Sequence, residues 1–250
     1  MESAVLPLLF AHRGGKTDAP ENTLAAFRWV SENRIAAVEL DVHRCATGEL
    51  VVIHDFRTRR ICGADYKVEE TPFAVLRSLD AGSSFDKRFT GEKIPLLEEI
   101  FDLLGSSVFY DIEIKTPRFF GDAKLVDEVM QLIDEKGLCG NSMISSFNPF
   151  VVRRARKKRF PLTAVIFAED DDVPLLWKRG FGWYVARSTH LKPGRQLLFS
   201  GRMLKGLKKR NLPVMTWTVN DVQEALRLKN EGVVGICTNC PLTLRDAGIC

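Results

Sequence analysis

The side chains of this sequence that are best suited to chemistry stand at the ends of short apolar runs. His12 follows the run at residues 6–11, and His54 follows the run at residues 50–53. Imidazole titrates near neutral pH, so two histidines that meet in one site can serve as a general acid and a general base. We therefore interpret His12 and His54 as a candidate catalytic pair.

Three carboxylates lie in strand-like segments of strictly alternating character. Glu39 and Asp41 are two residues apart in ELD, and Glu113 lies in DIEIK, where Asp111 is one layer deeper. Residues two apart on a strand share a face, so Glu39 and Asp41 point the same way and Glu113 joins them from the neighbouring strand. Such carboxylates repel one another unless a cation joins them, and oxygen ligands favour Mg2+ or Ca2+. The sequence therefore predicts a site for one divalent cation.

Positive charge stands at the same strand ends. Arg13 follows the first apolar run closely, and Lys115 is the last residue of DIEIK. The planar fork of an arginine fits a phosphate group bidentately, and a lysine adds a point charge. Gly14 and Gly15 let the backbone turn sharply and approach a ligand. These residues indicate a substrate that contains phosphate.

The elements that position these side chains follow a regular alternation of apolar runs and amphipathic stretches. This pattern is typical of βα units around a parallel sheet, and eight units fit a closed (β/α)8 TIM barrel, whose active-site groups gather at the carboxyl ends of the strands. The strands are predicted at residues 6–11, 36–41, 107–115, 142–146, 162–167, 182–186, 213–218 and 233–237. The helices are predicted at residues 22–33, 95–104, 122–136, 148–158, 172–179, 199–210, 221–231 and 241–247, with Asn22 as the cap of the first.

One segment breaks this alternation. Residues 42–94 are too many for a simple loop and contain the apolar run at 50–53, which predicts a small insertion after the second strand that packs back against the barrel. The 250 residues fit one large barrel and are too few for two average domains with a linker. We therefore expect a single domain over residues 1–250.

Composition favours a cytoplasmic protein. The net charge is only +4, and the basic clusters at 153–159 and 208–210 are typical of solvated helix faces. No nucleic-acid partner is expected, whereas peripheral contact with an anionic membrane stays open, and the oligomeric state is not indicated. No stretch reaches the ~20 apolar residues of a membrane span. The six scattered cysteines indicate reduced thiols, and Cys237 and Cys240 lack the second pair of a CxxC zinc site.

Together, the motifs resemble the glycerophosphodiester phosphodiesterase family. HRGG, PENT, ELD, VVIHD, EIK, the pair SF at 146 and 147, WTVN at 217–220 and GICTNCP occur in the order and approximate spacing of that family, and the resemblance covers residues 11–241. It implies a (β/α)8 barrel with a small insertion. It also implies hydrolysis of a glycerophosphodiester, such as glycerophosphocholine or glycerophosphoethanolamine, to sn-glycerol 3-phosphate and an alcohol with a divalent cation.

The resemblance assigns roles to the residues that match the motifs. Trp217 resembles the aromatic residue that borders the glycerol pocket, and Phe147 would line the same mouth. Glu21 and Asn22 of PENT would fix the first loop and cap the helix behind it. The remaining matches are His12 and His54 as the acid–base pair, Arg13 and Lys115 as phosphate ligands, and Glu39, Asp41 and Glu113 as metal ligands.

Two positions depart from the pattern of the family. Residues 56–60 replace a turn that commonly contains proline, which leaves the shape of the alcohol-side pocket open. Asn239 stands where the family often has aspartate, and no loss of activity is expected because no transferred role falls on it.

Other functions are compatible with the same residues. Cleavage of lysophospholipids by a lysophospholipase D-type reaction depends on loops that the sequence does not define. A secreted phospholipase D toxin would also use two histidines and acidic ligands, but it would normally carry an export signal and disulfides. A non-catalytic phosphate-binding barrel would be free to lose a histidine or a carboxylate, and this chain retains every expected group.

Overall fold

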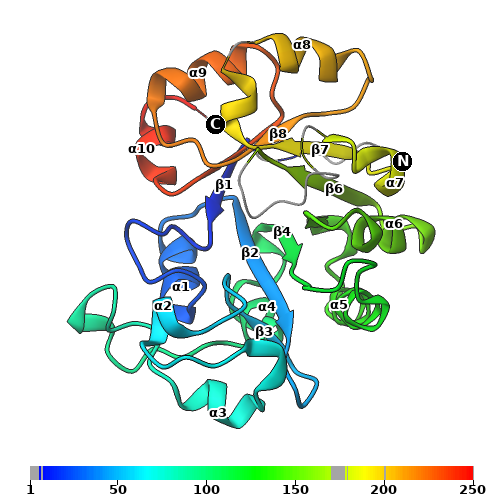
Figure 1. Ribbon diagram of the computed structural model, residues 1–250. Coiled ribbons are helices and arrows are strands. Elements are labelled where there is room, and N and C mark those ends of the chain that lie inside the picture. Colours follow the sequence, from blue (N-terminus) through cyan, green and yellow to red (C-terminus); the bar gives the residue numbers. More distant parts are fainter. Residues whose placement is uncertain (1–5, 7, 170–177, 179, 200, 250) are drawn as a thin grey trace.

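The apolar runs form parallel strands that close into a barrel (Figure 1). The computed structural model describes residues 6, 8–169, 178, 180–199 and 201–249. Across these residues the strand order is β7-β6-β5-β4-β2-β1-β9-β8, and backbone bridges from Leu191 to Val214 and from Gly194 to Trp217 bring the segments of β7 and β8 together. The barrel strands are β1 (Leu9–His12), β2 (Ala37–Arg44), β4 (Phe109–Ile114), β5 (Ser142–Ser146), β6 (Leu162–Phe167), β7 (His190–Pro193), β8 (Met215–Thr216) and β9 (Gly235–Thr238). The predicted (β/α)8 TIM barrel is confirmed.

Helices surround the strands, and their ends follow local signals in the sequence (Figure 1). The side chains of Asp122, Asn148 and Asp221 accept hydrogen bonds from the first turns of α5, α6 and α9, which stabilises those turns. In the described part of the chain, no helix is both long and apolar enough to cross a bilayer. The helix expected at residues 172–179 lies, apart from Lys178, outside the described residues. The helices are α1 (Leu24–Glu32), α4 (Leu97–Leu104), α5 (Ala123–Glu135), α6 (Pro149–Lys157), α7 (Trp183–Ala186), α8 (Arg202–Lys208), α9 (Val222–Asn230) and α10 (Pro241–Asp246).

The segment between β2 and α4 forms the expected insertion, drawn largely in cyan in Figure 1. Its strand β3 (Leu50–Val52) pairs antiparallel with the end of β2, so the apolar run at 50–53 does pack back against the barrel. The insertion has a small core of its own, which includes Val51, Val68 and Leu76. Its other elements are α2 (Arg59–Cys62), α3 (Phe73–Ser78) and the 3-10 turns η1 (Val68–Glu70) and η2 (Lys87–Phe89). Further 3-10 turns lie at η3 (Gly105–Ser107), η4 (Cys139–Asn141) and η6 (Arg195–Leu198).

Successive residues of a strand point alternately out of the barrel and into it, so the apolar residues of the strands pack in two separate layers. Outward residues such as Val38 and Leu40 pack among buried residues of the surrounding helices. A separate cluster, which includes Phe10, Phe109 and Met215, packs together from alternate positions of the strands. The polar residues described below come two or four positions further along the same strands. They therefore lie nearer the carboxyl end of the barrel than this apolar cluster does.

The predicted sixth strand is wrong. Residues 182–186 contain α7, one turn of helix, and the strand at this place in the barrel is β7. Aromatic and β-branched residues give 182–186 the composition of a strand, whereas β7 carries the polar residues His190 and Lys192 at alternate positions. Both are buried in the structure. Their polarity concealed the strand, because a buried strand is expected to read as an apolar run.

The predicted cap of the first helix is displaced by one residue. Thr23 is the N-cap of α1, and its side chain accepts a hydrogen bond from the N–H of Ala26. Asn22 has a φ of 57°, a left-handed conformation that asparagine tolerates better than most residues. Its amide donates to Asp41 Oδ2 at 2.9 Å, so Asn22 supports the site and not the helix.

Candidate active site

Three carboxylates converge where β2 and β4 end. The strand register pairs Asp41 with Glu113, and Glu39 lies two residues before Asp41 on the same face. One oxygen from each carboxylate lies within 4.8 Å of the others, and all three residues are buried. The structure therefore brings together the three residues that the sequence assigned to one cation. We call this group the acidic cluster.

Two carboxylates of the acidic cluster, Glu39 and Asp41, have pKa values shifted in opposite directions. Burial and the neighbouring charge of Asp41 hold the pKa of Glu39 well above its ordinary value. Burial acts in the same direction on Asp41, but the charges of Lys115 and Arg13 outweigh it and hold the pKa of Asp41 well below its ordinary value. Lys115 Nζ is 3.0 Å from Asp41 Oδ1 and also contacts Glu113. Buried oxygen ligands that repel one another in this way fit a hard divalent cation.

Arg13 lies at the turn after β1 and contacts the acidic cluster from one side. Its backbone N–H donates to Glu39 Oε2 at 3.1 Å, and its Nε is 3.4 Å from Asp41 Oδ2. Its Nη1 donates to Glu21 Oε1 at 2.8 Å. Glu21 thus fixes this loop, as the sequence suggested, by holding the guanidinium beside the carboxylates.

The two glycines after Arg13 serve helix packing as well as the turn. Gly14 and Gly15 have φ values of 83° and 92°, which favour glycine. A Cβ on Gly14 would lie 2.8 Å from the Cβ of Ala26, and one on Gly15 would lie 2.5 Å from Cζ3 of Trp29. Both neighbours belong to α1, so the loop lies directly against that helix.

His12 projects from β1 toward the acidic cluster. Its Nδ1 is 2.6 Å from Asn239 Oδ1. An amide oxygen only accepts hydrogen bonds, so Nδ1 carries the proton, and Nε2 keeps its lone pair 3.8 Å from Glu39 Oε2. Burial, reinforced by the charge of Arg13, lowers the pKa of His12 to about 3. A neutral imidazole in this tautomer can accept a proton through Nε2. The sequence marks Asn239 only as a departure from the family, with no predicted role, whereas the structure places it in contact with His12.

His54 reaches the same region from the insertion. The N–H of Ile53 donates to the backbone oxygen of Asp41 at 3.1 Å, which ties this segment to β2. His54 Nδ1 is 2.6 Å from Asp55 Oδ1, and the other oxygen of Asp55 accepts from Arg60 Nε at 2.6 Å. Asp41 is close enough to both His12 and His54 to interact with them electrostatically, so the two candidate histidines lie on one cluster.

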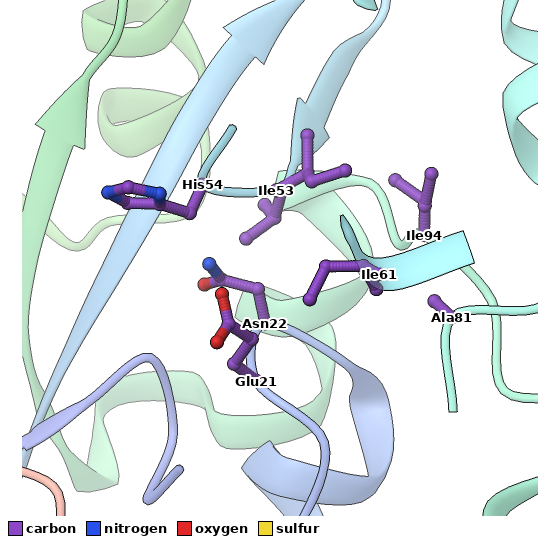
Figure 2. Close-up of a pocket in the computed structure, with 8 residues that line it drawn as sticks. Glu21, Asn22, Ile53, His54, Ile61, Ala81 and Ile94 are labelled. Carbon is purple, nitrogen blue, oxygen red and sulfur yellow. The ribbon is translucent and has the colours of Figure 1, made fainter. Parts of the chain in front are cut away.

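A small pocket opens beside His54 (Figure 2). Figure 2 shows the imidazole of His54 turned away from the apolar side chains of Ile61, Ile94 and Ala81. The polar ends of Glu21 and Asn22 line the part of the pocket between them. The apolar wall comes from the insertion, so the insertion shapes one side of the mouth.

The two predicted substrate-binding aromatic residues pack against each other. Phe147 and Trp217 meet edge to face with ring centroids 5.5 Å apart, and Lys115 Nζ lies 5.9 Å from the centroid of the Phe147 ring. Trp217 Nε1 donates to the backbone oxygen of Lys192 at 3.2 Å, which fixes the indole. The structure therefore brings both predicted substrate-binding aromatics beside the predicted phosphate-binding lysine.

The sequence analysis missed a buried lysine beneath the acidic cluster. Lys192 is 2 % exposed, and its Nζ is 2.7 Å from Asp111 Oδ2. Asp111 also accepts a hydrogen bond from Ser145 Oγ at 2.6 Å. Burial lowers the pKa of Lys192, but the charges of Asp111 and Glu39 outweigh it and raise the pKa above its ordinary value. Lys192 could have been found from the alternation of residues along β7, but the sixth strand was predicted at 182–186 instead.

Cys237 is another buried residue for which the sequence indicated no role at the site, although its strand was predicted. It lies on β9 opposite Phe10 of β1 and is 1 % exposed. Its sulfur, a ring nitrogen of His12 and an oxygen of Glu39 lie within 4.8 Å of one another. Cys240, its partner in the CxxC spacing, contacts Thr238 and the backbone oxygen of Asn220 instead.

Comparisons with known proteins agree on one family. The model of the glycerophosphoryl diester phosphodiesterase family matches residues 12–243. A glycerophosphodiester phosphodiesterase of Caldanaerobacter subterraneus subsp. tengcongensis is 32% identical over 242 residues, which cover 95% of this chain and 96% of that protein.

Solved structures show the same relationship. An Oleispira antarctica phosphodiesterase in complex with the product sn-glycerol-3-phosphate has a TM-score of 0.81 and 26% identity, covering 97% of this chain and 96% of that one. A putative glycerophosphoryl diester phosphodiesterase from Silicibacter pomeroyi shares the fold, with a TM-score of 0.82 and 23% identity over 98% of this chain and 94% of that one. This chain belongs to the glycerophosphoryl diester phosphodiesterase family and is a phosphoric diester hydrolase.

Proposed function

We propose that this enzyme hydrolyses glycerophosphodiesters, such as glycerophosphocholine or glycerophosphoethanolamine, to sn-glycerol 3-phosphate and an alcohol in a metal-dependent reaction. The observation that carries the proposal is the convergence of two histidines, Arg13 and Lys115 on one buried acidic cluster. The product named for the Oleispira antarctica relative supports the same substrate class.

The cationic side chains position the phosphate. Arg13 and Lys115 lie against the acidic cluster, where both can turn their donors to the non-bridging oxygens of a phosphodiester. A Mg2+ or Ca2+ ion held by Glu39, Asp41 and Glu113 would supply Lewis-acid stabilisation of the charge that builds on those oxygens. Phe147 and Trp217 border the glycerol moiety.

The two histidines divide the proton transfers. His12 accepts a proton through Nε2 from the attacking oxygen, which is either water or the neighbouring glycerol hydroxyl. Its neutral state and its Nδ1 hydrogen bond to Asn239 suit this role. His54 donates a proton to the leaving alkoxide, and the contact of its Nδ1 with Asp55 Oδ1 at 2.6 Å orients the ring for this transfer.

Removal of either histidine tests this assignment. Because general acid–base catalysis contributes ~10²–10⁴-fold per group, His12→Ala and His54→Ala should each lower kcat on glycerophosphocholine by about that factor. Circular dichroism and urea unfolding establish that each variant is folded. Full turnover by either folded variant contradicts the two-histidine mechanism.

The metal requirement is tested separately. Excess EDTA should abolish turnover, and Mg2+ or Ca2+ should restore it, because the three carboxylates would otherwise repel one another and the substrate. Glu39→Gln removes one charged ligand and should raise the metal concentration needed for half-maximal activity. A panel of glycerophosphodiesters and lysophospholipids, assayed with each ion, defines the headgroup preference. Activity that persists unchanged in EDTA would remove the metal from the proposal.

The remaining expectations concern the setting of the reaction. We propose that residues 1–250, with the insertion at 42–94, act as one barrel domain in the cytoplasm on small-molecule substrates. The cysteines that the structure describes are free thiols, which supports a reducing compartment. Cell fractionation that recovers the activity with membranes or in an extracellular fraction would contradict this location.

A further inference from the structure

We propose that His12, Glu39 and Cys237 form a second metal site, distinct in chemistry from the acidic cluster, that binds a thiol-seeking divalent ion such as Zn2+ and thereby stops the reaction. We call this group the thiol site. Its inhibitory effect rests on the proposed catalytic role of His12. The existence of the site rests only on the geometry of three neighbouring strands.

The three ligand residues come from adjacent strands. His12 of β1 pairs in register with Glu39 of β2, and Cys237 of β9 pairs with Phe10, two residues before His12 on β1. One potential ligand atom from each lies within 4.8 Å of the other two. All three are at least nine-tenths buried, so their positions are set by strand pairing and not by flexible loops.

The histidine is already oriented as a metal ligand. Ligating imidazoles usually donate their other N–H to an oxygen acceptor, which fixes the tautomer and the ring orientation. Here Asn239 Oδ1 receives Nδ1–H at 2.6 Å, and Nε2 faces Glu39 Oε2 at 3.8 Å. A gap of that length between two ligand atoms leaves room for an ion to contact both, because zinc bonds to nitrogen and oxygen are only about 2.0–2.2 Å.

The donor set decides which class of ion the thiol site prefers. One nitrogen, one sulfur and one carboxylate oxygen are typical ligands of Zn2+, whereas Mg2+ and Ca2+ favour oxygen alone. On binding, the Cys237 thiol releases its proton to solvent and forms a sulfur–metal bond, and the thiolate and the Glu39 carboxylate then offset the two charges of the ion. Water can complete the fourth position.

Occupation of the thiol site has a direct chemical consequence. A metal bound to Nε2 of His12 occupies the lone pair that would accept a proton from the attacking oxygen. Glu39 belongs to both the thiol site and the acidic cluster, so the ion also withdraws a ligand from the hard cation. Micromolar zinc should therefore inhibit the enzyme even when Mg2+ is abundant, and Cys237 should determine its affinity.

The first experiment reads the site without turnover. Co2+ is titrated into the full-length apoenzyme in excess Mg2+, and the near-ultraviolet sulfur-to-cobalt charge-transfer band is recorded. The wild type and Cys240→Ser should show the band, whereas Cys237→Ser should not. Cys240 is a matched control because it lies three residues away and hydrogen-bonds outside the thiol site. Absence of the band in the folded wild type, or its survival in Cys237→Ser, overturns the proposal.

The second experiment measures zinc affinity and inhibition. Loss of an outer-shell partner typically weakens metal binding by roughly 10–100-fold, so loss of the direct sulfur ligand should weaken Zn2+ binding at least that much. Cys237→Ser and Cys237→Ala should raise the calorimetric Kd for Zn2+ and the zinc concentration for half-inhibition, each relative to the zinc-free rate of the same variant. Unchanged values in both variants overturn the thiol site. An inactive wild type that still gives the cobalt band instead overturns the proposed function.

Discussion

The buried carboxylate of Glu21 contacts three positively charged side chains beside the acidic cluster, although Glu21 is not a member of that cluster. Its carboxylate accepts from Arg13 at 2.8 Å and from Arg60 at 2.6 Å, and it lies 3.0 Å from Lys16 Nζ. Burial raises its pKa, but the hydrogen bonds from Arg60 and the charges of Arg13 and Arg60 outweigh burial and lower the pKa to about 2. Glu21 is therefore ionised at neutral pH and stabilises the folded state.

The low pKa of Glu21 predicts a specific loss of stability in acid. Its ordinary pKa of 4.5 applies when the chain is unfolded, so the contribution is complete above pH 4.5 and is lost as the pH falls toward 2. A tenfold change in proton affinity corresponds to about 1.4 kcal/mol, which gives Glu21 up to about 3 kcal/mol at pH 7.

Substitution of Glu21 measures that contribution. Glu21→Gln should lower the free energy of unfolding in urea at pH 7 and lessen its decline between pH 4.5 and 2. Glu70→Gln is the control, because Glu70 is exposed and its ion pair with Lys67 at 2.9 Å lies at the surface, so the substitution should change stability by a few tenths of a kcal/mol. Equal effects of the two substitutions would contradict a special role for Glu21.

At the residue scale, the site residues are predicted correctly where the alternation of side chains along a strand is enough to determine which way each side chain points. Glu39, Asp41 and Glu113 meet because positions two apart on a strand share a face and because β2 lies beside β4. It fails for Asn239 and Cys237, whose contacts with His12 join segments at opposite ends of the chain. Such contacts depend on the exact register of β9 with β1, which no local pattern specifies.

At the scale of elements, β7 shows why a strand with buried polar residues is difficult to predict from the sequence. Its two inward residues are polar, so it lacks the apolar character that identified the other strands. Burial is tolerated because Lys192 is paired at 2.7 Å with Asp111 of β4, from which β7 is separated by β5 and β6. The partner of Lys192 lies on a different strand, so the reason for its burial appears only once the barrel is closed.

The pairing of Lys192 with Asp111 predicts how β7 responds to mutation. Removing one partner of a buried ion pair typically costs about 3–5 kcal/mol, because the other charge is left uncompensated. Lys192→Met should therefore lower the free energy of unfolding by about that much, and Lys192→Met combined with Asp111→Asn should recover a large part of it. Urea unfolding measures both.

An exposed lysine supplies the control for this cycle. Lys124 is 67% exposed in its side chain, so Lys124→Met should change stability by less than about 1 kcal/mol. If Lys192→Met were as mild as Lys124→Met, or if the double variant were no more stable than Lys192→Met, the ion pair would not be what holds β7 in the barrel.

At the scale of the whole molecule, closure of the barrel completes the candidate site. β9 pairs with β1, and Asn239 follows directly after β9 to accept the hydrogen bond of His12 across 227 positions of sequence. The turn after β1 is tied to the same place, because Thr17 Oγ1 donates to the backbone oxygen of Asn239 at 2.8 Å. The orientation of the proposed base is thus set by the last strand.

Asn239 therefore predicts a kinetic effect. Loss of the group that orients a catalytic histidine costs ~10⁴-fold in kcat in a serine protease, and a neutral amide should contribute less, about tenfold or more. Asn239→Leu keeps the size of the side chain but removes the acceptor, so kcat should fall by about tenfold with KM little changed. Asn239→Asp keeps an acceptor and should retain most of kcat. Equal rates for both variants and the wild type would show that the hydrogen bond does not orient His12.

The link between His12 and Asn239 also bears on how the enzyme is made. On the ribosome, Asn239 is joined to the chain 227 residues after His12. Until then the histidine lacks its acceptor and β9, one of the two strands that pair with β1, so the proposed catalytic residues are not yet held in place. A truncated product that lacks β9 and the residues after it therefore lacks the acceptor that orients the proposed base.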